Sequence, residues 1–307
     1  MSKSKTKKAD GTGLASRADF EALTDLWARS FDDPEPYIRN FHTLLAEPEN
    51  TVVFRDGDRI VSAAYLIPAD LHIGDETYRA YYFYAASTHP DHRRHGYMEQ
   101  VIRYCRTLCE ERNIDFLVLV PAGNDLYQYY SRFGFRANFY LKTTQLDRQQ
   151  LLTLVEKLDP EESEETETTG LPPVTEMERV RKAALSGGSY LEFDRKTLQY
   201  MLFEHLYRGG KTLLQEDAYV LYRLEEEDDG TTTLTVKEFC SAAAPEKQLR
   251  ALTAVDADRY ILNLPAFDTI RGGKTSTGRA GMDLAVSKRA VKAERTMKNA
   301  YIGLTMG

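Results

Sequence analysis

Residues 88–98 read Thr-His-Pro-Asp-His-Arg-Arg-His-Gly-Tyr-Met, and this stretch decides how the N-terminal half of the chain folds. It follows an apolar, aromatic run at 81–86 and precedes a segment with helical periodicity, so it connects a strand to a helix. The first backbone N–H groups of a helix have no partner within it, and the helix dipole makes this end positive. Arg93 and Arg94 add charge in a geometry that suits phosphate. The sequence therefore predicts an anion site here, and we expect a pyrophosphate as its ligand.

The segment after this turn predicts an amphipathic helix that ends near Arg112. Its apolar side chains recur at the i, i+3, i+4, i+7 spacing of one helix face: Met98, Val101, Ile102, Cys105, Leu108 and Cys109. A strand at 116–120 follows. Strand, helix and strand make one crossover unit, so we expect strands 82–88 and 116–120 to run parallel.

The residues before this unit predict two helices and an antiparallel sheet. Apolar spacing predicts helices over 18–30 and 37–46. Strands at 51–55 and 59–68 flank Asp56-Gly57-Asp58, which is typical of a hairpin turn. Segments 71–73 and 78–85 extend the same sheet.

Two motifs carry a resemblance to a known family. Arg-x-x-Gly-x-Met at 93–98 resembles the Arg/Gln-x-x-Gly-x-Gly/Ala turn of the GCN5-related N-acetyltransferases (GNAT), which holds the pyrophosphate of acetyl-CoA. Met98 departs from that pattern, and its bulk narrows the approach to the phosphates without removing the N–H donors. Residues 124–135, Asn-Asp-Leu-Tyr-Gln-Tyr-Tyr-Ser-Arg-Phe-Gly-Phe, are similar to the family's Asn-x5-Tyr-x3-Gly-Phe signature. The helix and strand between the motifs also follow the family's order.

The resemblance implies an α/β (α+β) GNAT fold, in which helices flank a mixed sheet that splays at its centre. The run around Trp27 and the closing residues 300–304 are similar to bacterial two-domain proteins of this superfamily. The mycobacterial enhanced-intracellular-survival acetyltransferases are more distant relatives. We therefore expect a disordered tail (1–14), a catalytic domain (15–147), a linker with a connecting helix (148–190) and a smaller, degenerate GNAT-like domain (191–307).

The second half has its own pattern of elements. Asp194 is expected to cap a helix through Tyr207 that Gly209-Gly210 ends. Strands at 218–225 and 231–239 form a hairpin, followed by a short helix at 246–253 and a strand at 260–264. The acidic, Thr-rich run 157–170 indicates an exposed linker or hairpin tip. This half lacks the basic turn and the Tyr-x3-Gly-Phe motif, so we expect it to wall the substrate cleft rather than to bind acetyl-CoA.

The resemblance also assigns roles in the donor site. Backbone groups of Ala86, Ser87 and Thr88 would bind the pantetheine arm and the oxyanion; the alternative is an ordinary buried strand. The pyrophosphate cradle would comprise Arg93, Arg94, His95, Gly96, Tyr97 and Met98, and the alternative is a solvated basic turn. Asn124 would bond the CoA arm or cap a helix. Tyr130 would protonate the departing thiolate, whereas Tyr127 and Tyr129 favour a packing role for the whole helix.

Other residue patterns point to less specific sites. Asp32, Asp33 and Glu35 lie in a loop that borders the acceptor site in the family, but we expect them to cap helices and to promote solubility instead. In the mycobacterial relatives the C-terminal carboxylate reaches the active site, which leaves that role open for Gly307. His89, His92 and His95 are spaced by three, yet Pro90 precludes a regular helix between the first two, so no metal is expected. Gly273-Lys274-Thr275 lacks the preceding glycine of a phosphate-binding loop and indicates a flexible loop.

Composition bounds the function. The formal charge of −7 over 307 residues argues against a nucleic-acid surface. There is no apolar run near the ~18 residues of a membrane span, and the three cysteines favour a reducing cytoplasm. We expect an N-acetyltransferase that transfers the acetyl group of acetyl-CoA directly to a small-molecule or peptide amine. The alternative is a non-catalytic acyl-CoA-binding or regulatory module, which Phe at position 130 would have favoured. A homo-oligomer remains open.

Overall fold

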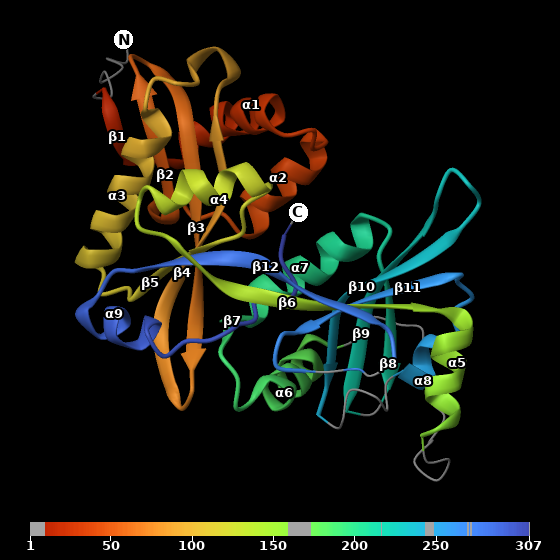
Figure 1. Ribbon diagram of the computed structural model, residues 1–307. Helices are drawn as coiled ribbons and strands as arrows, with labels where there is room; N and C mark the ends of the chain where they lie inside the picture. The colour runs from red at the N-terminus through yellow and green to blue at the C-terminus, as the bar shows by residue number, and fades with distance from the viewer. Residues whose placement is uncertain are drawn as a thin grey trace. The chain divides into compact units, whose positions relative to one another are not determined.

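A computed structural model describes residues 10–158, 173–215, 217–242, 249–268, 270 and 272–306, which form two compact units (Figure 1). Unit 1 contains the residues up to Asp70, residues 78–136 and residues 282–295. Unit 2 contains residues 71–77, 137–281 and 296–307. The chain therefore passes between the units several times, and residues 282–295 return to unit 1 before the last residues rejoin unit 2.

Unit 1 is built on a sheet with the strand order β1-β2-β3-β4-β5-β12. Its strands are β1 (Gly11–Leu14), β2 (Thr51–Asp56), β3 (Arg59–Ile73), β4 (Glu76–Thr88), β5 (Phe116–Leu119) and the last residues of β12 (Lys274–Ala285). The β2–β3 hairpin is confirmed, as is the parallel pairing of β4 with β5. The expected tail is wrong at residues 11–14, because β1 pairs antiparallel with β2 along its whole length.

Five helices of unit 1 lie against this sheet: α1 (Phe20–Ser30), α2 (Glu35–Leu44), α3 (Tyr97–Glu111), α4 (Asn124–Ser131) and α9 (Lys288–Glu294). Short 3-10 turns cover Arg17–Asp19, Pro48–Asn50 and Pro90–His92. The stripe predicted for α3 is confirmed, since Val101, Ile102, Cys105, Leu108 and Cys109 are buried. On α1, Leu23 and Leu26 pack against Val53, Ile60 and Ala63 of the sheet.

The C-terminal part of β12 was not predicted. Met282 to Ala285 pair antiparallel with Leu119 to Phe116 of β5, and α9 follows directly (Figure 1). The expected flexible loop at 273–275 is wrong, because β12 begins at Lys274. A Cβ atom on Gly273 would lie 2.5 Å from the Gln145 carbonyl oxygen, so two backbones meet closely at this position.

Unit 2 has a sheet with the order β12-β6-β11-β10-β9-β8. The strands are β6 (Arg136–Asp147), β8 (Lys211–Gln215), β9 (Ala218–Glu226), β10 (Thr232–Ser241) and β11 (Arg259–Pro265), and β7 (Tyr190–Phe193) pairs with β3. The predicted hairpin of β9 and β10 and the predicted strand β11 are confirmed. Its helices are α5 (Arg148–Glu156), α6 (Val174–Leu185), α7 (Arg195–Tyr207) and α8 (Leu249–Leu252).

Local signals explain the helix ends in unit 2. The Asp194 carboxylate accepts a hydrogen bond from the Thr197 N–H (2.8 Å), and Gly209 adopts the left-handed conformation after α7 (φ +80°), both as predicted. Residues 249–252 of the predicted helix 246–253 are helical, and the rest of that helix up to 248 lies outside the described residues. Most of the predicted acidic linker, from 159 on, also lies outside them.

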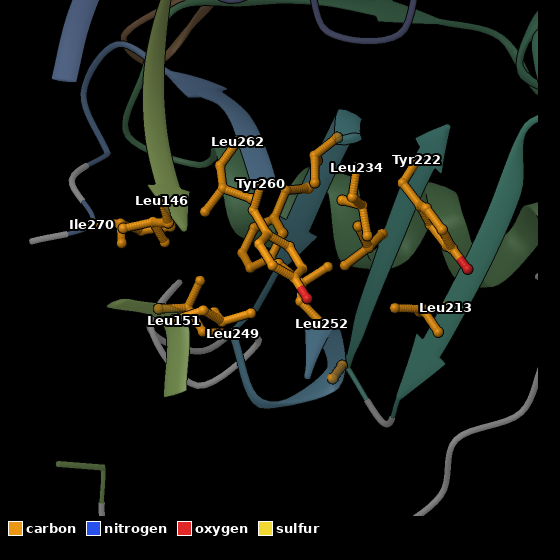
Figure 2. Packing of buried hydrophobic residues seen from close by; sticks show 14 of the residues in the cluster. Leu146, Leu151, Leu213, Tyr222, Leu234, Leu249, Leu252, Tyr260, Leu262 and Ile270 are labelled. Atoms are coloured by element: carbon orange, nitrogen blue, oxygen red, sulfur yellow. The ribbon is translucent and has the colours of Figure 1, made fainter. Parts of the chain in front are cut away.

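A single apolar cluster holds the sheet of unit 2 against α5 and α8. Figure 2 shows side chains of β9, β10 and β11 meeting those of the two helices, among them Leu234, Tyr260, Leu262, Leu151 and Leu252. Each of these five side chains is at most 1% exposed. Burial on this scale supplies most of the stability of such a unit. Within the described ranges, no helix has the length and apolar character that crossing a membrane requires.

Candidate donor site in unit 1

The parallel strands β4 and β5 of unit 1 separate where the sequence predicts a ligand-binding site. Their pairing covers Ala80–Tyr82 and Phe116–Val118, whereas β4 continues to Thr88. Ala85 has a positive φ of +46°, which is unusual for a residue with a side chain and bends the strand there. Beyond Tyr82 the backbone of β4 therefore lies outside the β4–β5 ladder, and its groups on this side need another partner.

The other edge of this strand end is fixed by β3. The Ser62 hydroxyl donates to the Ser87 carbonyl oxygen (2.9 Å) and lies 2.9 Å from the Thr88 hydroxyl. The His89 N–H donates to the Val61 carbonyl oxygen (2.9 Å). Ser87 is buried and Ala86 and Thr88 are half-buried. These contacts hold residues 86–88 in one position, as a preorganised binding strand needs.

The basic turn that follows has an open, concave backbone. Arg94 (φ +67°) and Gly96 (φ +78°) both adopt left-handed conformations, and alternation of this kind turns successive N–H groups toward one point. Gly96 is the N-cap of α3 and provides no side-chain cap, so the first N–H groups of the helix remain available. A Cβ atom on Gly96 would meet no atom within 4 Å. The turn thus has the donors and the space for an anion.

The side chains of the turn are exposed or fastened to neighbouring backbone. Arg93, Arg94 and His95 are exposed, and the Arg93 Nε–H donates to the Thr88 carbonyl oxygen (3.3 Å). His95 Nδ1 donates to the Arg93 carbonyl oxygen (2.9 Å). Met98 is half-buried in the first turn of α3. The side chains of Arg93, Arg94 and His95 are therefore exposed to solvent at the same turn.

Asp56 of the β2–β3 hairpin also contacts this region, which no sequence pattern indicated. The Tyr97 hydroxyl donates to the Asp56 carboxylate (3.3 Å), and the Tyr97 ring stacks on Phe54 with 4.4 Å between ring centroids. Burial and the Asp56 charge raise the pKa of Tyr97. Tyr97 is thus anchored on β2, which leaves its backbone N–H as the group it can offer to a phosphate.

The three predicted histidines have separate partners. His89 Nδ1 accepts from the Asp91 N–H (3.3 Å), and His92 Nδ1 lies 3.7 Å from the Asp56 carboxylate. Across the part of the chain that the structure describes, no three His, Cys, Asp or Glu side chains are grouped as metal ligands.

Tyr130 lies on α4 with its ring packed against other aromatic side chains. The ring makes edge contacts with Phe83 (6.4 Å), Phe135 (5.7 Å) and Tyr129 (5.2 Å), and the side chain is 8% exposed. Burial, and to a lesser extent Tyr129, raises the pKa of Tyr130, so the phenol stays protonated at neutral pH. The hydroxyl is not among the buried oxygens without a partner in the described structure. A packed phenol that stays protonated at neutral pH suits a proton donor.

Asn124 is the first residue of α4 and its side chain is exposed. The N-cap of this helix is Gly123, so the predicted capping role of Asn124 is wrong. The side chain remains free to bond a ligand at the start of the helix.

The acidic residues between the first two helices have structural partners. The Trp27 indole N–H donates to the Asp33 carboxylate (2.9 Å), and the Arg39 Nε–H donates to Glu35 (2.6 Å). Asp32 is exposed. Asp33 and Glu35 therefore have structural partners, although neither side chain caps a helix. Gly307, whose carboxylate was the other open possibility, lies outside the described residues.

With this geometry established, the chain can be compared with known proteins. Residues 14–137 match the family model described as an acetyltransferase (GNAT) domain. No curated protein sequence matches the chain.

Solved structures show the same fold at low identity. A GCN5-related N-acetyltransferase from Anabaena variabilis ATCC 29413 is 15% identical, with a TM-score of 0.69 over 90% of this chain and 72% of that one. One from Kribbella flavida is also 15% identical, with a TM-score of 0.69 over 94% and 74%. Eis1 from Mycobacterium abscessus is 13% identical, with a TM-score of 0.68 over 90% and 74%.

Proposed function

We propose that the protein is an acetyl-CoA-dependent N-acetyltransferase acting on a primary amine, because residues 14–137 match the family model of the GNAT acetyltransferase domain. One observation supports this most. The pairing of β4 with β5 ends after Tyr82, and Ala85 has a positive φ. The turn that follows contains two left-handed residues and leads into a helix without a side-chain cap. A strand edge and an anion-binding turn in sequence fit a ligand with an extended amide arm ending in a pyrophosphate.

In the proposed complex the pyrophosphate accepts hydrogen bonds from the N–H groups of residues 94–98, with charge supplied by Arg93 and Arg94. The pantetheine amides pair with the free edge of residues 86–88, and Asn124 bonds the same arm. These contacts hold the thioester in one place before the amine arrives. Met98 narrows the approach to the phosphates.

Transfer proceeds directly from donor to acceptor. The nitrogen of a neutral amine attacks the thioester carbonyl carbon, and the resulting oxyanion accepts a hydrogen bond from a backbone N–H of β4. Collapse of this intermediate breaks the C–S bond and forms the amide. The Tyr130 hydroxyl gives its proton to the departing thiolate and regains one from solvent, into which the amine releases its own. We place this reaction in the cytoplasm, where a reducing environment suits the free thiols of Cys105, Cys109 and Cys240.

The donor assignment is tested by thermal denaturation with and without acetyl-CoA. Binding to the native state raises the melting temperature by mass action, and an excess of a hundred times Kd adds roughly 2.7 kcal/mol. Gly96→Glu places a carboxylate where the pyrophosphate would sit and should abolish the shift. Gly209→Glu is the matched control, since Gly209 has a similar φ (+80°) and equally open space in unit 2. A full acetyl-CoA shift in Gly96→Glu would place the donor elsewhere.

The activity itself is tested by thiol release with a panel of amines: an aminoglycoside, a polyamine, a peptide with a free N-terminus and a lysine peptide. Release of CoA that depends on one of them supports the transferase. A robust acetyl-CoA shift with no release for any amine would favour the non-catalytic acyl-CoA-binding module instead.

A further inference from the structure

Two cationic side chains lie next to each other on unit 2, away from every role assigned above. Arg223 of β9 is the register partner of Thr235 on β10, and Lys237 occupies the β-bulge just beyond, between Val236 and Glu238. Both cations are half-buried. His205, near the end of α7, lies close enough to feel both charges. Burial lowers the pKa of His205, and the charges of Arg223 and Lys237 lower it further, whereas its hydrogen bond to the Lys211 carbonyl oxygen raises it.

Neither cation has an ion-pair partner within the described residues. No ion pair or hydrogen bond joins Arg223 or Lys237 to an acceptor there, and the Arg223 Nε–H is buried without a partner. Burial and then the Arg223 charge lower the pKa of Lys237, while Glu225 acts weakly in the other direction. Glu225 is exposed.

Glu238, whose charge acts on His205, already has three donors. Glu238 accepts from the Arg181 Nε–H (3.2 Å), the Tyr219 hydroxyl (2.8 Å) and the Leu304 N–H (3.1 Å). Two like charges held together in a half-buried place repel, and a buried N–H without a partner is costly. An anionic guest would remove both penalties.

We propose that Arg223, Lys237 and the Thr235 hydroxyl bind the phosphate group of a small ligand. The guanidinium presents a fork of donors that matches phosphate oxygens, and the ammonium adds a second charge, so the pair balances a dianion. A phosphate monoester fits this charge better than a carboxylate. The site is independent of the acetyl-CoA site, which lies among residues of unit 1.

The test follows the Arg223 Nε–H resonance of the full-length protein by 15N–1H NMR during titration with inorganic phosphate. The titration is done in the Gly96→Glu variant, because phosphate would also enter the turn of unit 1. The Arg223 signal is identified by its loss in Arg223→Lys, which keeps the charge and removes the fork. Sodium acetate at matched ionic strength is the monoanion control.

We expect the Arg223 Nε–H signal to shift and saturate with phosphate and to move much less with acetate. Lys237→Gln should weaken the phosphate affinity roughly tenfold or more, as loss of a charged contact does. Lys274→Gln removes the same charge from an exposed position of unit 2 and should leave the affinity unchanged. A signal that does not respond to phosphate, or an affinity that Lys237→Gln leaves intact, would overturn the proposal. Neither result bears on acetyl-CoA binding.

Discussion

His42 shows how one buried side chain is committed to a single protonation state. The Thr24 hydroxyl donates to the Phe20 carbonyl oxygen (2.9 Å), so it accepts from His42 Nδ1–H (3.1 Å). His42 Nε2 then accepts from the Tyr65 hydroxyl (2.6 Å). Burial, and then the charge of Arg39, lowers the pKa of His42 from 6.5 to about 4. The neutral imidazole of His42 makes both of these hydrogen bonds, to Thr24 and to Tyr65.

The free energy of unfolding should therefore fall as the pH drops from 6.5 to about 4. Because the pKa of His42 is lower in the folded state, the unfolded chain takes up the proton first as the pH falls. The stability contributed by neutral His42 is complete above pH 6.5 and is lost toward pH 4. By pH 5 the loss is about 2 kcal/mol. Urea denaturation of the parent and of His42→Gln at pH 7.5 and pH 5 measures it. The parent should lose about 2 kcal/mol more than the variant, and equal losses would contradict the assignment.

Tyr130→Phe should lower turnover about 10²- to 10⁴-fold, the range that one general acid usually contributes. The change removes one hydroxyl and keeps the edge contacts with Phe83 and Phe135. The acetyl-CoA thermal shift should therefore stay within error of the parent. Tyr127→Phe, on the same helix, serves as the control for a lost phenol and should leave turnover close to normal. Equal turnover in the parent and Tyr130→Phe would assign thiolate protonation to water.

At this scale the sequence predicted which residues form the basic turn but not how they are held. A left-handed arginine at position 94 could not be anticipated, because that conformation is associated with glycine. The bond from Tyr97 to Asp56 joins residues that lie 41 positions apart. No local pattern encodes such a contact.

Among the elements, α9 depends on one buried carboxylate of unit 1. Asp115 accepts from the Ser287 hydroxyl (2.6 Å) and from two donors of Arg289, Nε (2.9 Å) and Nη2 (2.6 Å). Its side chain is 6% exposed. Burial alone would raise the pKa of Asp115, but these hydrogen bonds lower it overall. The carboxylate therefore fixes the start of α9 while it is ionised.

Asp115→Asn should lower the free energy of unfolding by about 1.5–3 kcal/mol, the value of hydrogen bonds to a charged group. Hydrogen exchange should rise first in α9. Glu110→Gln, which loses an exposed ion pair with Arg106, should cost at most about 0.5 kcal/mol. Similar losses in both variants would mean that Asp115 contributes no more than a surface charge.

The buried pair of Arg181 and Glu238 plays the corresponding part in unit 2. Both side chains are at most 3% exposed, and between them they bond the Ile302 carbonyl oxygen and the Leu304 N–H. Glu238→Gln leaves the arginine buried with no counter-charge and should cost about 3–5 kcal/mol, measured by urea denaturation. Glu226→Gln, an exposed carboxylate of β9, should stay within about 0.5 kcal/mol of the parent. A small effect of Glu238→Gln would indicate that Arg181 finds another acceptor.

The elements that the sequence predicted well carry local signals. Asp-Gly turns, the Asp194 cap and the apolar stripe of α3 each identify an element from a few adjacent residues. The first part of β12, Lys274 to Gly281, is polar and has no alternation, so it resembles a loop until its pairing partners are known. β6 was missed as well, since its partner β11 follows it by more than a hundred residues.

For the whole molecule we expect one acetyl-CoA per chain, because the strand end, turn and tyrosine that form the proposed donor site all belong to unit 1. Titration calorimetry of the full chain should give a stoichiometry near one, and Gly96→Glu should reduce it to zero. A second acetyl-CoA equivalent that persists in this variant would show that unit 2 binds the cofactor too.

A fragment ending at Asp147 should be poorly soluble or inactive, although it retains every proposed donor contact. It lacks Met282 to Ala285, which pair with β5, and so leaves β5 as an exposed edge strand of the unit 1 sheet. Co-expression with residues 148–307 should restore soluble protein. A soluble, fully active fragment would show that β12 is dispensable for unit 1.

The pairing of β12 with β5 also delays the completion of the unit 1 sheet during synthesis. The ribosome must add the roughly 160 residues between β5 and β12 before the β5 edge finds its partner, which takes about 10–30 s at ordinary elongation rates. During that interval the nascent chain presents four apolar residues, Phe116 to Leu119, with one side open. Unit 1 is thus the first to be translated and among the last to be completed, and its yield in cells should depend on chaperones that shield this edge.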